Sequence, residues 1–471
     1  MQGKKVYQEK LFVSFRLSDR VPLDNFYRRL NEVLDLNWLY KATSKYYGTE
    51  GPKSIDPTVF FKLALIGYFE NFASDRRIID TVSMRMDLLL FIGYDIDEQI
   101  PWHSTISRTR QLYDKVLFKE LFQRVLAQCI DKGMVAGHRQ AIDSVFMKAN
   151  ASMDSLVAKD ILEKGLFYID DLCSQDNKVD EAAGTEREGA VESKTNVKLN
   201  HRYRSSTDAD ARVSTKQGKS VALNYLTQVS VDTASHVITN IDVHHADKGD
   251  SHCLEEVLEQ TQSNLEANGL KLEEVLADTG YSSGAVLQYL EDKNIEGYIP
   301  NKRGYKPERE GFTYDIINDE YICSQGKVLS FKGSKEGNKG CYRKIYMSSS
   351  ADCSVCPLRS QCIGKSPTKK ISVSEQNVLF DKMAKKLQTR KGKRMCRLRG
   401  STVEPVIGTL SIFLAMKRVN TIGIEQAAKC AVMSACAYNI KKLLKFCPSL
   451  RKAIIKVAQQ ARIAPKSLFS S

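Results

Sequence analysis

The 471-residue sequence lacks a hydrophobic run long enough to cross a membrane. Its longest apolar stretch is LLLFIGY, at residues 88–94, whereas a membrane-spanning helix needs about 20 apolar residues. The first ten residues, MQGKKVYQEK, also lack the apolar segment of a secretory leader. These absences exclude a transmembrane helix, and we expect a cytoplasmic protein with no membrane partner.

A second C-x2-C pair is also missing, and the seven histidines have no ligand spacing to the cysteines. Twelve cysteines are present, but a reducing cytoplasm does not favour disulfides. Five of them lie between residues 323 and 362. Cys353 and Cys356, together with Cys323 and Cys362, offer four thiolates for a tetrahedral structural Zn²⁺, with Cys341 as a substitute ligand. The alternative is a group of reduced, buried thiols.

Acidic residues are absent from one long stretch near the C-terminus. Residues 382–399 contain nine Lys or Arg and no Asp or Glu, and the whole chain has a formal net charge of +14. Such a charge favours an anionic partner, nucleic acid above all. We expect this stretch to bind DNA phosphates, and the alternative is a solvated basic face. The expected DNA-binding residues here are Lys391, Lys393, Arg394, Arg397 and Arg399.

The N-terminal part of the chain shows helical periodicity. Apolar residues recur every three or four positions in PLDNFYRRLNEVLD and IDPTVFFKLALIGYFENF, which predicts an all-α domain over residues 1–130. In PWHSTISRTRQLY, Ser104 is predicted to cap a helix that carries Arg108 and Arg110. This arrangement is typical of a helix-turn-helix DNA reader. An amphipathic helix with solvated arginines is the alternative.

From about residue 137 the pattern changes to that of strands. RQAIDSVFMKANA predicts a first strand, and VALNYLTQVSVDT and HVITNIDVHHA predict a hairpin. A helix, a strand, a helix and a final strand follow up to about residue 302. This order indicates an α/β fold in which helices flank a mixed sheet, over residues 131–310. The polar segment at about 154–206 interrupts it and is predicted to be a mobile insertion.

Three carboxylates stand at notable positions in this order of elements. Asp143 lies within the first strand, Asp278 ends the fourth, and Glu404 begins an apolar, helix-like segment. Each has an ordinary explanation: an edge residue, a helix cap and an acid in a first helical turn. If the three converge, their mutual repulsion requires cations, and Mg²⁺ prefers such oxygen ligands. Two Mg²⁺ ions at such a site support in-line phosphoryl transfer.

The motifs AIDSVFMKANAS, LADTGYSS and RLRGSTVEPVIGTL, which contain these carboxylates, resemble a known family. It is the bacterial insertion-sequence transposases with an RNase H-like DDE catalytic core. GPKSIDPTVFFKLALIGYF and PWHSTISRTRQ are similar to the helical N-terminal domain of that family. The resemblance implies an RNase H-like mixed sheet, a Cys-rich, zinc-ribbon-like insertion over residues 311–375, and residues 376–471 completing the catalytic core.

The resemblance also implies an activity. Asp143, Asp278 and Glu404 are then the catalytic and Mg²⁺-binding residues, two ions are expected, and Mn²⁺ is able to substitute. The reaction is cleavage and joining of double-stranded DNA at the terminal inverted repeats of the element and at a target, without a covalent protein–DNA intermediate. Because two DNA ends must be held together, a homodimer on DNA is expected.

One departure from the family pattern affects a cation. Ser411 stands where the family usually has a Lys seven residues after the Glu, and Ile407 stands where a Phe is common. Lys417 or Arg418 are candidates to supply the missing charge. Two other functions stay open from the sequence: a metal-dependent nuclease with the same carboxylates, and a DNA-binding protein without catalysis.

Overall fold

The computed structural model describes residues 14–159, 199–302 and 309–446, apart from gaps at 49, 51–53, 216–219 and 337–341, together with residues 2, 5 and 8. Most of the predicted insertion, residues 160–198, lies outside the described residues. At its borders, β2 (Leu156–Ala158) pairs with β3 (Tyr203–Ser205). In the described ranges, no helix combines the length and the apolar character that a membrane crossing requires.

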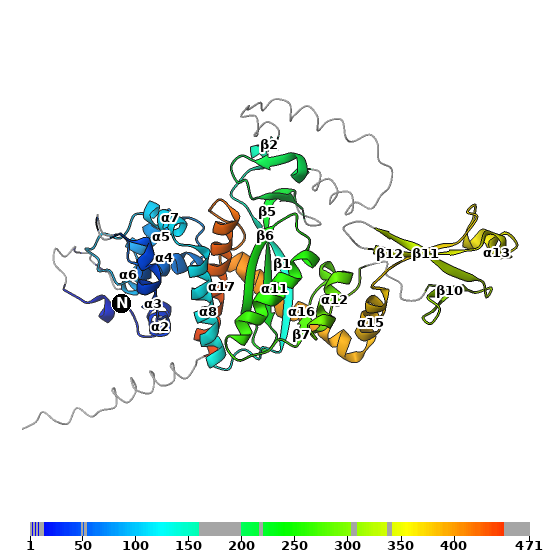
Figure 1. Ribbon diagram of the computed structural model, residues 1–471. Coiled ribbons are helices and arrows are strands. Elements are labelled where there is room, and N and C mark those ends of the chain that lie inside the picture. Colours follow the sequence, from blue (N-terminus) through cyan, green and yellow to red (C-terminus); the bar gives the residue numbers. More distant parts are fainter. Residues whose placement is uncertain are drawn as a thin grey trace, which may run out of the picture.

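The N-terminal part of the chain is helical, as predicted (Figure 1). Its helices are α1 (Leu17–Arg20), α2 (Phe26–Val33), α3 (Trp38–Thr43), α4 (Pro57–Phe69), α5 (Asp75–Ser83), α6 (Met86–Ile92), α7 (His103–Leu112) and α8 (Lys115–Asp131). The start of α4 is fixed by Asp56, whose side chain accepts hydrogen bonds from the amides of Thr58 and Val59. Apolar residues cover α4 on all sides, so it forms the centre of this helical group.

The cap of α7 differs from the prediction. The helix begins at His103, and Trp102 occupies the N-cap position without a side-chain hydrogen bond. Ser104 therefore lies inside the first turn. There its hydroxyl accepts a hydrogen bond from Arg108 instead of capping the helix.

A six-stranded mixed sheet forms the centre of the molecule. The order β4-β5-β1-β7-β8 runs across it, and β6 pairs with β5. The strands are β1 (Arg139–Lys148), β4 (Arg212–Ser214), β5 (Ala222–Asp232), β6 (Ile238–His245), β7 (Glu274–Leu276) and β8 (Glu296–Tyr298). Strand β1 is antiparallel to β5 and parallel to β7, so both of its edges are paired. The mixed α/β class and the predicted order of strands and helices are confirmed.

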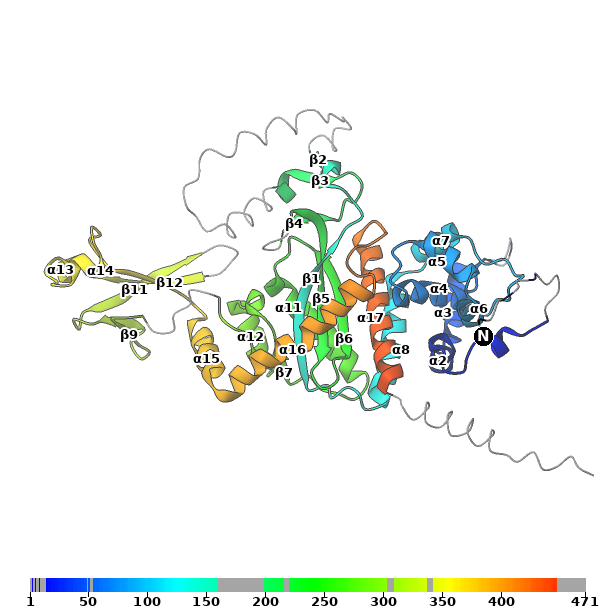
Figure 2. The ribbon, with the colours of Figure 1, turned by 180° about the vertical axis from the view of Figure 1, so that it is seen from behind.

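Helices cover both faces of this sheet. On the face seen in Figure 1 lie α11 (Asp250–Glu266) and α12 (Gly284–Asp292), whereas Figure 2 shows α16 (Arg390–Phe413) crossing the other face. The long α17 (Ile424–Phe446) packs against β6 and α8, and α15 (Asn377–Gln388) precedes α16. Helix α16 thus brings residues near 400 onto strands formed by residues 139–148 and 222–232.

A second sheet projects away from this core (Figure 1). Its five strands, in the order β13-β12-β11-β10-β9, are all antiparallel. They are β9 (Phe312–Asp315), β10 (Glu320–Cys323), β11 (Val328–Glu336), β12 (Tyr342–Ser348) and β13 (Lys370–Ser374), with α13 (Ser350–Ser354) and α14 (Arg359–Cys362) before β13. The buried core of this sheet consists of Tyr321, Leu329, Tyr346, Ile371 and Val373.

Candidate active site

Asp143 lies in the middle of β1, where it pairs with Val229 of β5 and stands two residues past the end of the pairing with β7. Its side chain is 18% exposed, and one carboxylate oxygen accepts the amide of Ser144 at 2.8 Å. Burial raises the pKa of Asp143, and the nearby Asp278 carboxylate adds to the rise, whereas the Ser144 amide and Arg399 oppose it. The chain therefore places a carboxylate where its charge is poorly solvated, as acidic metal sites require.

Asp278 follows β7, the parallel neighbour of β1. Ala141 is in register with Leu276, so Asp278 stands level with Asp143, two residues farther along each strand. Adjacent strands are about 4.8 Å apart. Asp278 also caps the short 3-10 helix η4 (Thr279–Tyr281), where it accepts the amide of Gly280 at 2.8 Å. The helix-cap explanation for Asp278 is thus correct, and it coexists with the closeness to Asp143.

Glu404 reaches the same place from α16, on the other side of Arg399. The Arg399 guanidinium donates to Asp143 at 2.8 Å and to Glu404 at 3.2 Å. A Cβ on Gly400 would lie 3.2 Å from the Glu404 carboxylate, so the glycine leaves room for that side chain. The structure therefore relates both other carboxylates to Asp143: Glu404 is linked to it through Arg399, and Asp278 acts on its pKa from the turn after β7.

A second polar chain lies beneath this site and was missed by the sequence analysis. The buried Tyr281 hydroxyl donates to the side-chain oxygen of Gln228, and the Gln228 amide donates to Asp250 at 2.9 Å. A Cβ on Gly280 would lie 2.9 Å from the Asp250 carboxylate and 3.0 Å from that of Asp278. Burial raises the pKa of Tyr281, and the charges of Asp250, Asp143 and Asp278 raise it further. In the sequence, Asp250 looks like any acid in a first helical turn.

The basic residues of α16 divide into two groups. Lys391 is held by two carboxylates, at 2.8 Å from Glu274 and 3.0 Å from Glu296. Lys393, Arg394 and Arg397 are exposed, and within the described part of the chain they form no ion pair. The second group is therefore available to an anion, and Lys391 is engaged in packing the helix on the sheet.

The two arginines of α7 also differ from each other. Arg108 is exposed and donates only to Ser104 of its own helix. Arg110 is 8% exposed, and its guanidinium makes two hydrogen bonds to Asp75 of α5, at 2.9 and 2.6 Å. The prediction that Arg110 contacts DNA is therefore wrong for this structure: the side chain is buried and its donors already face a carboxylate.

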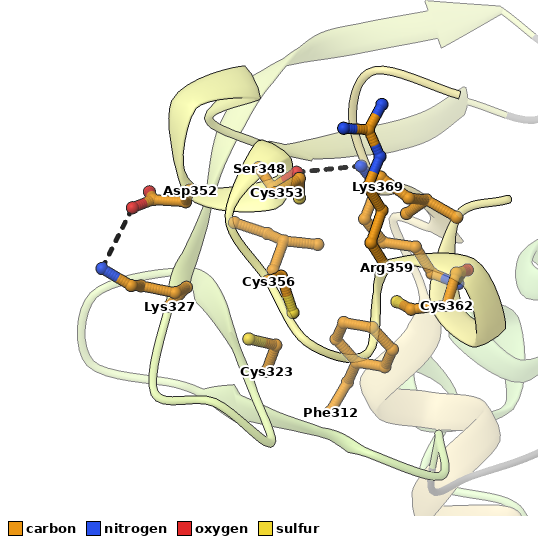
Figure 3. A pocket seen from close by; sticks show the side chains of 12 residues that line it. Phe312, Cys323, Lys327, Ser348, Asp352, Cys353, Cys356, Arg359, Cys362 and Lys369 are labelled. Atoms are coloured by element: carbon orange, nitrogen blue, oxygen red, sulfur yellow. Dashed lines mark hydrogen bonds and ion pairs between the residues drawn. The ribbon is translucent and has the colours of Figure 1, made fainter. Parts of the chain in front are cut away.

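The clustered cysteines lie together in the second sheet. Cys323, Cys353, Cys356 and Cys362 line one small cavity of about 40 Å³ beside Phe312 (Figure 3). All four are free thiols, and Cys353 is 3.0 Å from the hydroxyl of Ser348. Cys341 lies outside the described residues. Four soft sulfur donors around one cavity are a donor set that suits Zn²⁺.

The side chains of these two sites are not arranged as complete metal-coordination spheres. Among the described residues, no group of three His, Cys, Asp or Glu side chains is arranged to hold a metal ion. At the carboxylates, the Arg399 guanidinium lies between Asp143 and Glu404, where positive charge balances the two acids. The donor chemistry fits a hard divalent cation, because every free ligand is a carboxylate oxygen.

A mixed sheet with acidic residues on one strand, after its parallel neighbour and on a helix across its face is an arrangement suited to metal-assisted phosphoryl transfer. Two family matches then specify it. Residues 15–112 match a transposase domain (DUF772), and residues 322–444 match a transposase DDE domain. The chain therefore carries matches to two transposase domains, and the DDE domain implies an enzyme of the polynucleotidyl transferase and nuclease type.

The solved structures to which the chain is similar include two transposases. One is the piggyBac transposase in a synaptic complex with hairpin DNA, at 9% identity over 95% of this chain and 84% of that chain, with a TM-score of 0.34. The other is the Mos1 transposase in a paired-end complex with the left transposon end, at 12% identity over 57% of this chain and 67% of that chain, with a TM-score of 0.16. A comparison with curated proteins finds no match.

Proposed function

We propose that this transposase binds the terminal inverted repeats of an insertion sequence and catalyses Mg²⁺-dependent strand cleavage and strand transfer. The observation that carries the proposal is that Arg399 bridges Asp143 and Glu404, while Asp278 lies close enough to raise the pKa of Asp143. The three carboxylates would hold Mg²⁺, two ions being expected and Mn²⁺ able to substitute. When bound, the ions activate the attacking oxygen and stabilise the leaving oxygen.

The chain's own residues set the geometry of this reaction. Asp143 on β1 and Asp278 in the turn after β7 come from neighbouring parallel strands. Both carboxylates would therefore lie on the same side of the phosphate that reacts. Water first attacks that phosphate and releases a 3′-hydroxyl, which then attacks a phosphate of the target strand. The Arg399 guanidinium, which bonds to both Asp143 and Glu404, would hold these two carboxylates in position for the metal ions.

The DNA would be held by exposed cations on both sides of the site. These are Arg108 in the helical N-terminal part and Lys393, Arg394 and Arg397 on α16. Residues 1–130 would serve mainly in end binding, and residues 131–310 and 376–471 would together supply the catalytic core. Joining two ends requires two copies, so we expect a homodimer on DNA, in the cytoplasm.

The test is cleavage of a labelled duplex that carries the element's own end, which is read from the DNA flanking the coding region. Asp143→Asn, Asp278→Asn and Glu404→Gln should each reduce nicking by about a thousandfold or more, because metal-assisted stabilisation amounts to several kcal/mol. DNA binding should persist. Asp97→Asn, at an exposed surface carboxylate, is the matched control and should cut normally.

The other outcomes separate the alternatives. Nicking at the end followed by joined products supports the transposase. Nicking that never yields joined products favours a nuclease on the same core. Binding without cutting, in Mn²⁺ as well as Mg²⁺, would favour a DNA-binding protein without catalysis.

We also propose a structural Zn²⁺ held by Cys323, Cys353, Cys356 and Cys362. The support is that these four side chains, from three separate segments, line one cavity of a sheet whose buried core has only five residues. Zinc analysis of the purified protein should give one ion per chain, and Co²⁺ substitution should give thiolate charge-transfer absorption. Cys356→Ser should lose both signals, whereas Cys396→Ser on α16 should keep them. Full folding without any bound metal would favour reduced thiols.

A further inference from the structure

A second groove lies at the far end of β1 and α16, beyond the carboxylates. It encloses about 700 Å³ and is lined by residues of both elements and of the segment that follows α16. Ser411, the residue that stands where a cation was expected, is part of its wall. The groove is connected to Asp143 by α16, because the end of this helix lines the groove and its Arg399 contacts Asp143.

The segment after α16 is held against the end of β1 by backbone bonds. Ala415 adopts a left-handed φ of 54°, and Asn71 clamps the turn by donating to the carbonyl of Ile412 and accepting the amide of Ala415. Lys148 then donates its amide to the carbonyl of Lys417 at 3.1 Å and accepts the amide of Val419 at 3.0 Å. This pairing fixes the residues around 417 beside the last residue of β1.

The pairing places three cations in one groove. Lys148, Lys417 and Arg418 are all exposed, and the lining contains no Asp or Glu. Arg418 donates to the side-chain oxygen of Asn150, and in the described part of the chain none of the three forms an ion pair. Three neighbouring positive charges without a counter-charge repel each other, so the groove is suited to an anion.

The distance from the carboxylates suits a DNA strand. Ser411 lies seven residues after Glu404, which is about 10.5 Å along a helix. Successive phosphates of one strand of B-form DNA advance about 3.4 Å along the axis, so the groove lies about three nucleotides from the carboxylates. A B-form duplex whose axis runs along α16 past the carboxylates would therefore meet these cations next.

We propose that Lys148, Lys417 and Arg418 form a binding site for DNA backbone phosphates about three nucleotides from the scissile phosphate. The site supplies from β1 and from the segment after α16 the positive charge that Ser411 does not. The proposal rests on the proposed function for the direction in which the DNA runs. The binding of phosphate by the groove is a separate property and is measured separately.

The experiment compares two variants that lose the same charge. Lys148→Gln/Lys417→Gln removes two groove cations, and Lys132→Gln/Lys271→Gln removes two exposed lysines near the opposite end of β1. Affinity for the end duplex is measured in EDTA over a range of salt. Each lost phosphate contact should lower the affinity roughly fivefold at about 0.15 M salt and reduce the salt slope by about 0.9. The control variant should match wild type.

Two further measurements locate the effect. Methylphosphonate substitution, one position at a time, should weaken wild-type binding at phosphates about three nucleotides from the cut, and should have no effect there in the groove variant. Adding Ser411→Lys to the groove variant should restore much of the affinity. Equal losses in groove and control variants, or methylphosphonate effects that persist in the groove variant, would overturn the proposal.

Binding in EDTA also keeps the two proposals apart. A wild-type protein that binds the duplex and shows the groove effect, but never cuts in Mg²⁺ or Mn²⁺, would contradict the proposed function and leave the phosphate site standing. A protein that cuts specifically, with no difference between groove and control variants, would do the opposite. Absence of any duplex binding would reject both.

Discussion

At the residue scale, Arg399 decides how the three carboxylates can coexist. Its planar guanidinium reaches Asp143 with one nitrogen and Glu404 with another, although these acids come from β1 and α16. The side chains of Arg399 and Asp143 are each only 18% exposed, so their ion pair is poorly screened by water, whereas Glu404 is 65% exposed. A lysine has a single compact ammonium group and cannot make the same forked contact. Arg399 is therefore best described as a positioning residue for both acids.

Replacement of Arg399 by Lys should separate positioning from charge. We expect Arg399→Lys to slow nicking by about tenfold or more, because one lost charge-assisted hydrogen bond is worth about 1.5–3 kcal/mol. Duplex affinity in EDTA should change little, since the charge is kept. The control is Arg124→Lys on α8, an exposed arginine that pairs with Glu120. Equal nicking rates in the two variants would contradict the role given to Arg399.

At the element scale, the packing of α7 on α5 depends on one buried ion pair. Arg110 and Asp75 have side chains only 9% and 13% exposed, and their contact at 2.6 Å joins the two helices. Breaking a buried pair leaves one uncompensated charge in the interior, which costs about 3–5 kcal/mol. Replacing both partners by apolar residues removes that cost. The ion pair with Asp75 thus explains why Arg110 of α7 points into the protein, whereas Arg108 of the same helix is exposed.

We expect that replacing Arg110 alone lowers the stability of the protein, and that replacing both Arg110 and Asp75 restores most of it. Arg110→Met should lower the melting temperature clearly, and Asp75→Leu/Arg110→Met should recover most of it. Arg108→Met on the exposed face should have almost no effect on melting but should weaken DNA binding. Thermal unfolding and duplex affinity, measured on the same four proteins, check both statements. Unchanged melting in Arg110→Met would show that the ion pair is not important for packing.

The stability of the contact between α16 and the strands β7 and β8 is expected to depend on pH. Burial alone would raise the pKa of Glu296, but hydrogen bonds from Tyr298, Lys391 and Lys386 hold it at about 2. A carboxyl with a lowered pKa in the folded state stabilises the fold above its unfolded pKa of about 4.3 and loses that contribution as pH falls. The stabilisation should therefore fade between about pH 4.3 and about pH 2.

Acid unfolding of Glu296→Gln measures this contribution. The variant should be less stable than wild type at pH 7, and the difference between the two proteins should shrink as the pH falls through that window. Glu291→Gln, at an exposed acid on α12 that pairs only with Lys382, is the control and should follow wild type closely. A difference that stays constant from pH 7 to pH 2 would contradict the assignment.

The helices and strands show which features of the structure could be predicted from the sequence. The strands and helices of the central sheet were predictable because their apolar residues follow a period of two or of about 3.6. Asp143, Asp278 and Glu404 were found from their positions relative to those elements. Burial of Arg110 could not be predicted, because it depends on Asp75, 35 residues away. The Tyr281–Gln228–Asp250 chain joins three elements, and no local pattern marks it.

At the scale of the whole molecule, α16 connects the separate parts of the proposed DNA path. Its first turns carry the exposed Lys393 and Arg397, its middle carries Glu404, and its end borders the groove at Ser411. From residue 393 to residue 411 a helix extends about 27 Å. The carboxylate site thus lies between the cations in the first turns of α16 and the groove cations beside its end, as expected if DNA runs along α16.

This arrangement makes the two groups of cations independent contributors to binding. Lys393→Glu/Arg397→Glu should weaken duplex binding and lower the salt slope by about 1.8, since two phosphate contacts are lost. Because substitutions more than about 10 Å apart usually add, combining this pair with Lys148→Gln/Lys417→Gln should give the sum of the two losses in log affinity. Lys132→Glu/Lys271→Glu serves as the charge-reversed control. A combined loss no larger than either single loss would mean that both groups hold the same phosphates, and that the DNA does not extend along α16.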